Sequence, residues 1–375
     1  MKKTRIFFTC ISLIFASVTI AQQYYGATRG EKYGFIDTKG NFVIGEQFDQ
    51  VDIFADGMAR VKVGKLWGFI NDQGTLVIPP KFIKAKNFSE GIAQARETKL
   101  FGMIDKQGNF VIEAKYKNLE IFKDGMARAR TNKLWGYIDR SGNWLIPEKF
   151  EAVHDFFDDR AAAKSGGLWG YIDRTGNWTI EPRFNNVGAF SGDRTRVKIG
   201  KEGWKIIDLQ GNDIGGLRFE SLKDFEGNVA RAKKDGLWGL VDRSGNWVAE
   251  PQFKNLEKFH MGWARAKNET QWGFVDSQGL WVIPAGFDNV KDFYEGVAQA
   301  KMGDRWGYIE NSGTWVIPAK YLSAEKFVNG VARVRVNVGE LKYWGIIDKN
   351  DQYVVEPQFK NIRSLEASEL YSFFN

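Results

Sequence analysis

The side chains that could do chemistry in this 375-residue chain are few and scattered. The chain has two histidines, His154 and His260, and one cysteine, Cys10. A zinc site of the common kinds needs three or four His or Cys ligands, so the composition excludes one within a single chain. His154 precedes Asp155, an arrangement that can support acid–base chemistry, but both histidines lie at positions that vary between copies of a repeat. The sequence therefore predicts no catalytic residue, no metal, no cofactor and no enzymatic activity.

Residues 1–21 have the pattern of a signal peptide. Lys2, Lys3 and Arg5 precede a mostly apolar run, and Ala21 ends an acceptable cleavage site. Removing this segment takes away Cys10 and three of the 53 basic residues, which leaves 50 Lys and Arg against 46 Asp and Glu. We expect an exported protein (periplasmic, cell-surface or secreted) with no membrane span after cleavage. Its small net charge does not indicate a nucleic-acid partner.

A unit of about 34 residues is repeated ten times along the rest of the chain. The marker is Trp-Gly or a variant of it, beginning at Tyr33, Trp67, Phe101, Trp135, Trp169, Trp204, Trp238, Trp272, Trp306 and Trp344. The spacing between successive markers is 34 residues except for one of 35 and one of 38. Such regular self-similarity indicates a tandem-repeat protein.

One copy, residues 125–156, shows what each unit contains. The short alternating run GMARAR is followed by two further runs, LWGYID and WLIP, and turns separate the three. Asp-x-x-Gly between two of them, as at Asp139–Gly142, is typical of a β-hairpin turn. A proline then ends the third strand, because proline cannot donate to a strand ladder.

A tight turn before Trp135 predicts the register of the first hairpin. Arg128 should lie opposite Tyr137, and Arg130 opposite Trp135. We expect one dry face of Ala, Gly and Ile, which also receives Trp144 and Ile146, and an opposite face that carries the cations and aromatic rings.

The repeat is similar to the WG (or KWG) repeat family of bacterial proteins. The resemblance rests on the Trp-Gly dipeptide, the Tyr/Phe-Ile-Asp that follows it, the Asp-x-x-Gly turn and the Val-Ile-Pro-x-x-Phe tail. It covers the chain from about Tyr24 to Ile362. It implies a β-rich tandem-repeat protein, often exported, and it brings no catalytic residues.

The predicted fold is all-β, and residues 22–362 are expected to form an open solenoid or superhelix of ten hairpin units. A β-propeller, or two five-bladed propellers, is the alternative. Residues 212–216 depart from the repeat and could mark a seam between two halves. Residues 336–343 are an insertion, expected to lengthen a hairpin loop. Residues 363–375 are expected to form a tail or cap.

The repeated aromatic and basic residues suggest an extended binding surface. The leading hypothesis is an exported, non-enzymatic protein that binds a protein partner, and the alternative is a cell-surface or cell-wall glycan held by Trp or Tyr with Arg or Lys. The same residues could instead pair across strands only to stabilise each unit. The candidate binding residues are Trp67, Arg128, Trp135, Tyr137, Trp169, Trp238, Trp272 and Trp306.

Overall fold

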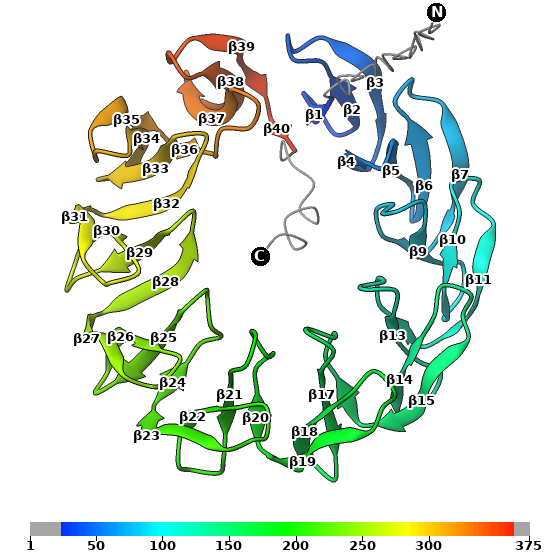
Figure 1. The fold of residues 1–375 in the computed structure, drawn as a ribbon. Coiled ribbons are helices and arrows are strands. Elements are labelled where there is room, and N and C mark those ends of the chain that lie inside the picture. The colour runs from blue at the N-terminus through cyan, green and yellow to red at the C-terminus, as the bar shows by residue number, and fades with distance from the viewer. Residues whose placement is uncertain (1–23, 364–375) are drawn as a thin grey trace, which may run out of the picture.

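The ten repeats form a closed ring of ten four-stranded antiparallel sheets. A computed structural model describes residues 24–363, and in it every sheet is one blade of a β-propeller (Figure 1). The open solenoid that we expected is therefore wrong, and so is the pair of five-bladed rings. The signal peptide expected at residues 1–21 lies outside the described residues, and so does the tail expected at 363–375, except for Arg363.

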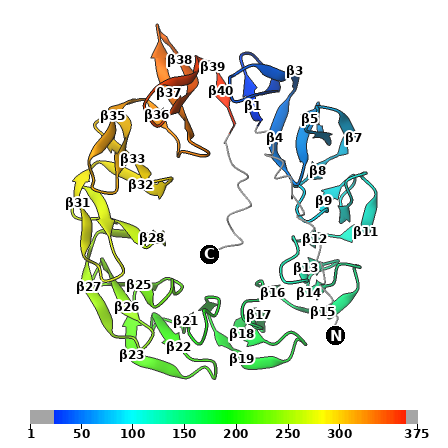
Figure 2. The same cartoon turned by 45° about the horizontal axis from the view of Figure 1, so that its top comes forward.

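Each blade has an inner, a second, a third and an outer strand, counted outward from the ring axis (Figure 2). The inner strands of blades 1 to 10 are β40 (Asn361–Ile362), β4 (Gln50–Ala55), β8 (Lys84–Ala85), β12 (Asn118–Leu119), β16 (Ala152–Val153), β20 (Asn186–Val187), β24 (Ser221–Leu222), β28 (Asn255–His260), β32 (Asn289–Tyr294) and β36 (Ser323–Ala324). The second strands are β1 (Tyr25–Thr28), β5 (Met58–Val63), β9 (Ala93–Arg96), β13 (Ala127–Arg130), β17 (Ala161–Ser165), β21 (Thr195–Lys198), β25 (Val229–Lys234), β29 (Trp263–Lys267), β33 (Val297–Met302) and β37 (Val331–Val338).

The third and outer strands complete each sheet. The third strands are β2 (Tyr33–Ile36), β6 (Leu66–Asn71), β10 (Phe101–Ile104), β14 (Trp135–Ile138), β18 (Leu168–Ile172), β22 (Trp204–Ile207), β26 (Leu237–Asp242), β30 (Trp272–Val275), β34 (Arg305–Glu310) and β38 (Leu341–Asp348). The outer strands are β3 (Phe42–Phe48), β7 (Leu76–Phe82), β11 (Phe110–Tyr116), β15 (Trp144–Phe150), β19 (Trp178–Phe184), β23 (Asp213–Phe219), β27 (Trp247–Phe253), β31 (Trp281–Phe287), β35 (Trp315–Tyr321) and β39 (Tyr353–Phe359).

Blade 1 joins the two ends of the described chain and closes the ring. Its second, third and outer strands come from the beginning, and its inner strand, β40, comes from the end. Ile362 pairs with Ala27 and Asn361 pairs with Thr28. The Arg363 N–H also donates to the Gly26 carbonyl at 2.7 Å. The chain therefore has the split blade that the sequence did not reveal to us.

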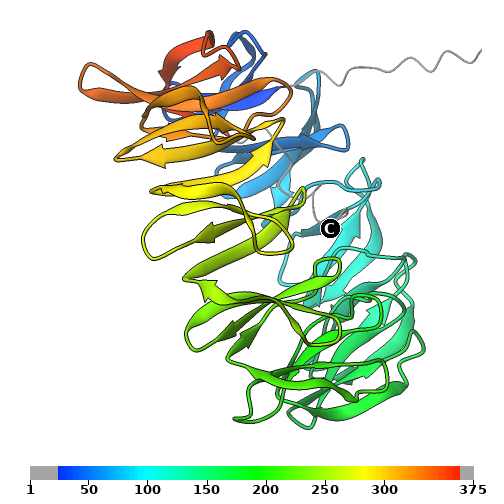
Figure 3. The same cartoon turned by 60° about the vertical axis from the view of Figure 1, so that its left-hand side comes forward.

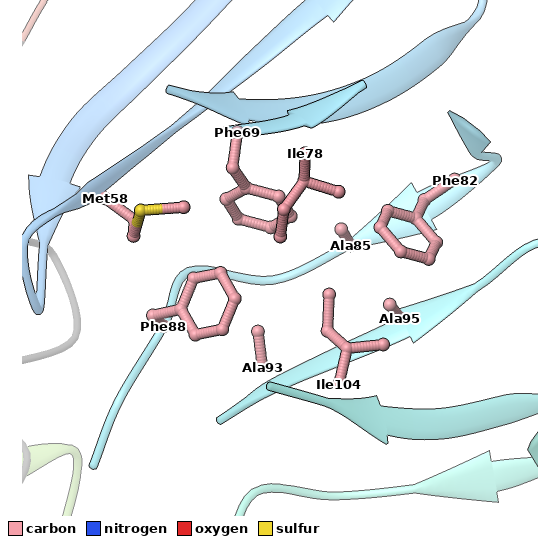
Figure 4. Packing of buried hydrophobic residues seen from close by; sticks show 9 residues of the cluster. All are labelled: Met58, Phe69, Ile78, Phe82, Ala85, Phe88, Ala93, Ala95 and Ile104. Carbon is pink, nitrogen blue, oxygen red and sulfur yellow. The ribbon is translucent and has the colours of Figure 1, made fainter. Parts of the chain in front are cut away.

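The hydrophobic core lies between neighbouring blades rather than inside one unit. Figure 4 shows one such cluster, in which Phe69 and Phe82 of blade 2 pack against Phe88 and Ile104 of blade 3. Within residues 24–363 a cluster of this kind fills each of the ten junctions, including the one between blades 10 and 1. Figure 3 shows the sheets lying face to face. Because both faces of each blade are covered, each sheet buries about twice the apolar surface area that it would bury if only one face were covered.

The predicted register of the first hairpin is confirmed, but its predicted faces are not. Arg128 lies opposite Tyr137 and Ala127 opposite Ile138. Tyr137 is only 1% exposed, because the next blade covers that face. Trp144 pairs with Ile138 whereas Ile146 pairs with Tyr137, so these two residues point to opposite faces. An irregularity in the outer strand separates them, which the sequence pattern could not place.

The prolines lie within the outer strands rather than ending them, contrary to our expectation. All eight prolines of the chain are in outer strands: Pro79, Pro80, Pro147, Pro182, Pro251, Pro284, Pro318 and Pro357. The outer edge of each sheet has no further strand to accept a hydrogen bond. The missing N–H of a proline at this edge therefore costs no hydrogen bond within the sheet, and the proline hinders pairing with a strand of another chain.

The two irregular units are ordinary members of the ring. In blade 6 the outer strand makes one larger register shift, and Gly215 and Gly216 have positive φ there. The blade is still a four-stranded sheet of the ring, so residues 212–216 do not divide the ring into two halves. In blade 10 the inserted residues do not lengthen a loop. They extend the hairpin, so that Val336 pairs with Tyr343 and Val338 with Leu341.

Candidate binding faces

The topology gives the ring two faces made of different connections. The inner hairpins, between inner and second strands, lie at the same end of a blade as the outer turns, between third and outer strands. An ion pair of 2.9 Å joins Asp56, at an inner-hairpin tip of blade 2, to Lys106, in the outer turn of blade 3. At the opposite end, the Gly64 N–H in a middle turn, between second and third strands, donates to the Asp49 carboxylate at 2.6 Å.

The first face is acidic. It contains the outer turns 37–41, 71–75, 105–109, 139–143, 173–177, 208–212, 242–246, 276–280, 310–314 and 348–352, and the inner-hairpin tips 56–57, 90–91, 124–125, 158–159, 192–193, 227–228, 261–262, 295–296 and 329–330. These segments hold 18 Asp or Glu residues against 6 Lys or Arg residues. We call this end of the ring the acidic face.

The opposite face is basic. Its cations include a column at the ends of the second strands: Lys62, Arg96, Arg130, Lys164, Lys198, Lys233, Lys267, Lys301 and Arg335. The other contributors are the middle turns 29–32, 63–66, 97–100, 131–134, 165–168, 199–203, 234–237, 268–271, 302–305 and 336–343, and the residues that lead into the next blade: 49, 83, 117, 151, 185, 220, 254, 288, 322 and 360. Together they hold 21 Lys or Arg residues against 11 Asp or Glu residues, and we call this end the basic face.

The six candidate tryptophans lie at the beginning of third strands, beside the middle turns of the basic face. Trp67, Trp135, Trp169, Trp238, Trp272 and Trp306 are all half-buried. Several pack against the clusters between blades, as Trp67 and Trp135 do. The structure thus brings these residues to one face at regular intervals, with part of each ring accessible.

Cations cover the exposed side of many of these rings. The Arg130 guanidinium lies 4.9 Å from the Trp135 ring, and the Lys62 ammonium 5.5 Å from the Trp67 ring. Such contacts contribute about 0.5–1 kcal/mol each at exposed sites. The contacts therefore stabilise the five blades in which a cation of the column lies over a ring, and these cations also remain partly exposed.

Arg128 and Tyr137, the other two candidates, tie one blade to the next. Arg128 donates to the Val153 carbonyl at 3.1 Å and forms an ion pair with Asp155 at 2.6 Å. The Tyr137 hydroxyl donates to the His154 carbonyl at 2.6 Å, and burial raises the pKa of Tyr137. The Tyr137 side chain is thus closed to solvent, and its position indicates a structural role.

The aspartates that begin the outer turns accept hydrogen bonds from their own turns. The Asp139 carboxylate accepts the Asn143 N–H at 2.8 Å and the Ser141 N–H at 2.9 Å. The hydrogen bond from Asn143 is the main reason why the pKa of Asp139 is below its usual range. The pKa of Asp173 is lowered in the same way, chiefly by the Thr175 hydroxyl. These contacts confirm that the aspartates are turn residues.

We predict that acid weakens these turns. A carboxylate whose pKa is lower in the folded chain stabilises it at pH values above the unfolded pKa of about 4, and this stabilisation is lost as the pH falls through the folded pKa. Asn71 makes the same turn without a charge, its side-chain oxygen accepting the Thr75 N–H at 2.9 Å. The variant D139N/D173N should therefore lose less thermal stability than the wild type when the pH is lowered from about 6 to about 2.5. Equal losses, followed by circular dichroism, would contradict this assignment.

The two histidines lie in different blades, and each packs against an aromatic ring. His154 stacks on the Trp169 ring at 4.7 Å, and burial, with Arg128 nearby, lowers the pKa of His154. His260 stacks on Tyr294 at 4.7 Å in a different part of the ring. Within residues 24–363 no cluster of three His, Cys, Asp or Glu side chains could hold a metal ion. The same part of the chain contains no helix long and apolar enough to cross a membrane.

The separation of charge between the two faces was missed in our sequence reasoning, which considered only the total charge. The signal was present in the repeat. Cations recur five residues before most of the Trp-Gly markers, and an acidic residue recurs four residues after nearly all of them. Because successive strands are antiparallel, these two positions lie at opposite ends of a blade.

Comparison with known proteins identifies the repeat. The family model of the WG containing repeat matches residues 33–67, 67–100, 101–135, 135–169, 169–202, 206–238, 238–269, 272–306, 306–337 and 344–371. No curated protein matches the sequence.

The similar solved structures are distant. A eukaryotic initiation factor is 9% identical, with 91% of this chain and 98% of that chain covered and a TM-score of 0.46. BamB from Moraxella catarrhalis is 12% identical, with 69% and 92% covered and a TM-score of 0.35. Hsv2p from Kluyveromyces lactis is 12% identical, with 70% and 96% covered and a TM-score of 0.33. Similarities this weak carry no argument about function.

Proposed function

This chain belongs to the family of proteins built from WG-containing repeats, and from that premise we propose that it is an exported, non-enzymatic scaffold that binds an acidic protein partner. The observation that carries the proposal is the basic face, where 21 cations gather at one end of the ring against 11 acidic residues. A surface of one sign speeds the association of a partner of the opposite sign and helps to select it.

The repeat supports binding through many similar contacts. The cations of the column recur in nine of the ten blades, and each is partly exposed. A partner that spans several blades would meet the same group at each step, so that weak contacts add up. Export is supported by the basic start of the chain, Lys2, Lys3 and Arg5, and by the apolar run after it.

We test the basic face with the variant K65E/K99E/K133E. These three lysines occupy the same exposed position in the middle turns of blades 2, 3 and 4. Poly-L-glutamate serves as the acidic polypeptide, and its binding to the mature chain is measured by biolayer interferometry. We expect at least about a tenfold weaker affinity for the variant, and weaker binding to the wild type as salt is raised from about 0.05 M to about 0.5 M.

The matched control is K81E/K115E/K149E. It changes the charge by the same amount in the same three blades, but at equivalent positions of the outer strands. We expect it to retain most of the binding. If this control weakens binding as much as the first variant does, the total charge matters rather than the face, and the proposal is wrong.

A cell-surface glycan is the second candidate, because half-buried tryptophans lie on the same face as the cations. Hyaluronan, an acidic polymer in which glucuronic acid alternates with N-acetylglucosamine, is the probe for this alternative. A change in tryptophan fluorescence with hyaluronan, together with no binding of poly-L-glutamate, would favour the glycan. Binding of poly-L-glutamate alone would favour the protein partner.

A further inference from the structure

Blade 8 departs from the repeat on the acidic face. Met261 is at the tip of its inner hairpin, where other blades have Asp, Glu, Asn or Gly. Its side chain is 79% exposed, and its φ is 51°. Every other non-glycine residue at positive φ in the described chain is Asp, Glu or Asn.

This backbone conformation is unfavourable for methionine. Asp and Asn tolerate it because their short polar side chains hydrogen-bond locally, whereas a long apolar side chain gains nothing there. The exposure of Met261 shows that packing within the ring does not compensate for the strain. Strain that the fold does not need is a sign of function.

Leu280 is a second apolar substitution at the same end of the same blade. It is the last residue of the outer turn and is 65% exposed. Other blades have Asn, Thr or Gln at this position, and there Asn can donate back to the aspartate, as Asn143 does to Asp139 at 3.3 Å. Leu280 cannot make that bond. Met261 and Leu280 are also the two most exposed large apolar residues in the described chain.

The ion pairs that join neighbouring blades on this face are absent around blade 8. At five other junctions a tip carboxylate pairs with a cation in the next outer turn, as Glu295 does with Lys349 at 3.3 Å. The equivalent positions in the outer turns of blades 8 and 9 are Ser277 and Asn311. These two turns contain Asp276 and Glu310 but no Lys or Arg, so the charge that these two turns carry is negative.

We propose that Met261 and Leu280 form a second docking site, on the acidic face, for a protein segment that carries Lys or Arg beside an apolar side chain. The apolar residues would anchor the segment, and the carboxylates of the turns around them would select its cations. The negative charge disfavours an anionic lipid surface as the occupant. This site goes beyond the proposed function, because it lies opposite the basic face and would let one ring hold two partners.

The test selects peptides from a random phage-displayed library on the immobilised full chain. The strongest peptide is then synthesised, and its affinity for the wild type and for M261D/L280N is measured by fluorescence polarisation. We expect Lys or Arg next to an aliphatic or aromatic residue in the selected peptides, and at least about a tenfold loss of affinity in the variant. Asp and Asn are the residues that other blades place at these positions, so the variant should fold.

The control and the stability of the variant make the proposal falsifiable. M302D changes an exposed methionine in a middle turn of the basic face and should alter the affinity by less than about twofold. The melting temperature of M261D should equal or exceed that of the wild type, because Asp suits positive φ better than Met does. A lower melting temperature, equal binding by wild type and variant, or a library without enrichment would overturn the proposal.

Discussion

Replacing Ile362 with Asp should open the ring. Ile362 is fully buried in the cluster between blades 10 and 1, where it packs with Tyr25, Val355 and Phe359. Placing a carboxylate there removes apolar contacts and buries a charge without a partner, at a cost of about 4 kcal/mol. Two residue pairs and two flanking backbone hydrogen bonds hold β40 to β1, and no hairpin joins these two strands, so we expect them to separate before any other neighbouring strands of the ring.

The opening should be visible in solution. Small-angle scattering of I362D should show a larger radius of gyration than that of the wild type, because only non-covalent contacts join β40 to the rest of blade 1. In each of the other nine blades a hairpin of the chain links the inner strand to the second strand. Chemical denaturation should show an earlier onset of unfolding in the variant.

L119D is the matched control for this closure. Leu119 occupies the same position in β12 as Ile362 does in β40, and it is 1% exposed. Its substitution should cost a similar free energy of unfolding, about 4 kcal/mol, but the chain continues on both sides of β12, so the ring should stay closed. If both variants expand equally, β40 is not the element that closes the ring.

The local structure of the repeat could be predicted from the sequence because short-range rules determine it. Alternation of apolar and polar residues specifies the second strand of the unit, and Asp139 with Gly142 specifies the turn after the third strand. The register of Arg128 and Tyr137 followed from the short connection before Trp135. Each of these features depends on residues fewer than about 15 positions apart.

The closure of the ring depends on residues more than 300 positions apart, and we missed it. A signal was nevertheless available. The chain ends its repeats with Asn361-Ile362, which matches the inner strands Asn118-Leu119 and Asn186-Val187. The first unit begins at Tyr25 with a second strand and has no such dipeptide before it. A missing inner strand at one end and an extra one at the other are typical of a blade shared between the two ends of a chain.

The faces of the blades were predicted wrongly for a related reason. A hairpin that packs on one side has one dry face, and we assigned the cations and aromatic rings to a wet one. In a ring both sides of a blade are covered, so Tyr137 is as buried as Ala129. Among the candidate binding residues Tyr137 alone is buried, whereas Arg128 and the six tryptophans remain partly exposed, the tryptophans at the basic face.

The glycine of the Trp-Gly marker should be the least replaceable residue of the unit. A Cβ on Gly136 would lie 2.4 Å from the Ile146 carbonyl oxygen and 2.8 Å from the Pro147 carbonyl carbon. Both atoms belong to the backbone of the outer strand, which bulges toward the third strand at this point. Moving a strand is harder than moving a side chain, so G136A should destabilise the protein by about 3 kcal/mol.

G45A separates this close approach from the ordinary effect of replacing a glycine. Gly45 also lies in a strand, β3, but a Cβ there would have no neighbour within 4 Å. We expect G45A to change the free energy of unfolding by less than about 0.5 kcal/mol, and urea denaturation measures both this variant and G136A. Equal effects of the two substitutions would contradict the role assigned to the bulge.

Blade 6 supports this assignment, because it is the unit in which the glycine is replaced. Lys205 takes the position of Gly136, and the outer strand opposite it makes a single larger register shift in place of two smaller ones. Gly215 and Gly216, at positive φ, allow that path. A side chain at the position after the marker tryptophan thus requires the outer strand to follow a different backbone path. We therefore expect G136A to be tolerated better when residues 144–150 are replaced with the equivalent blade 6 segment 213–219, and the urea denaturation midpoint of that double change measures the recovery.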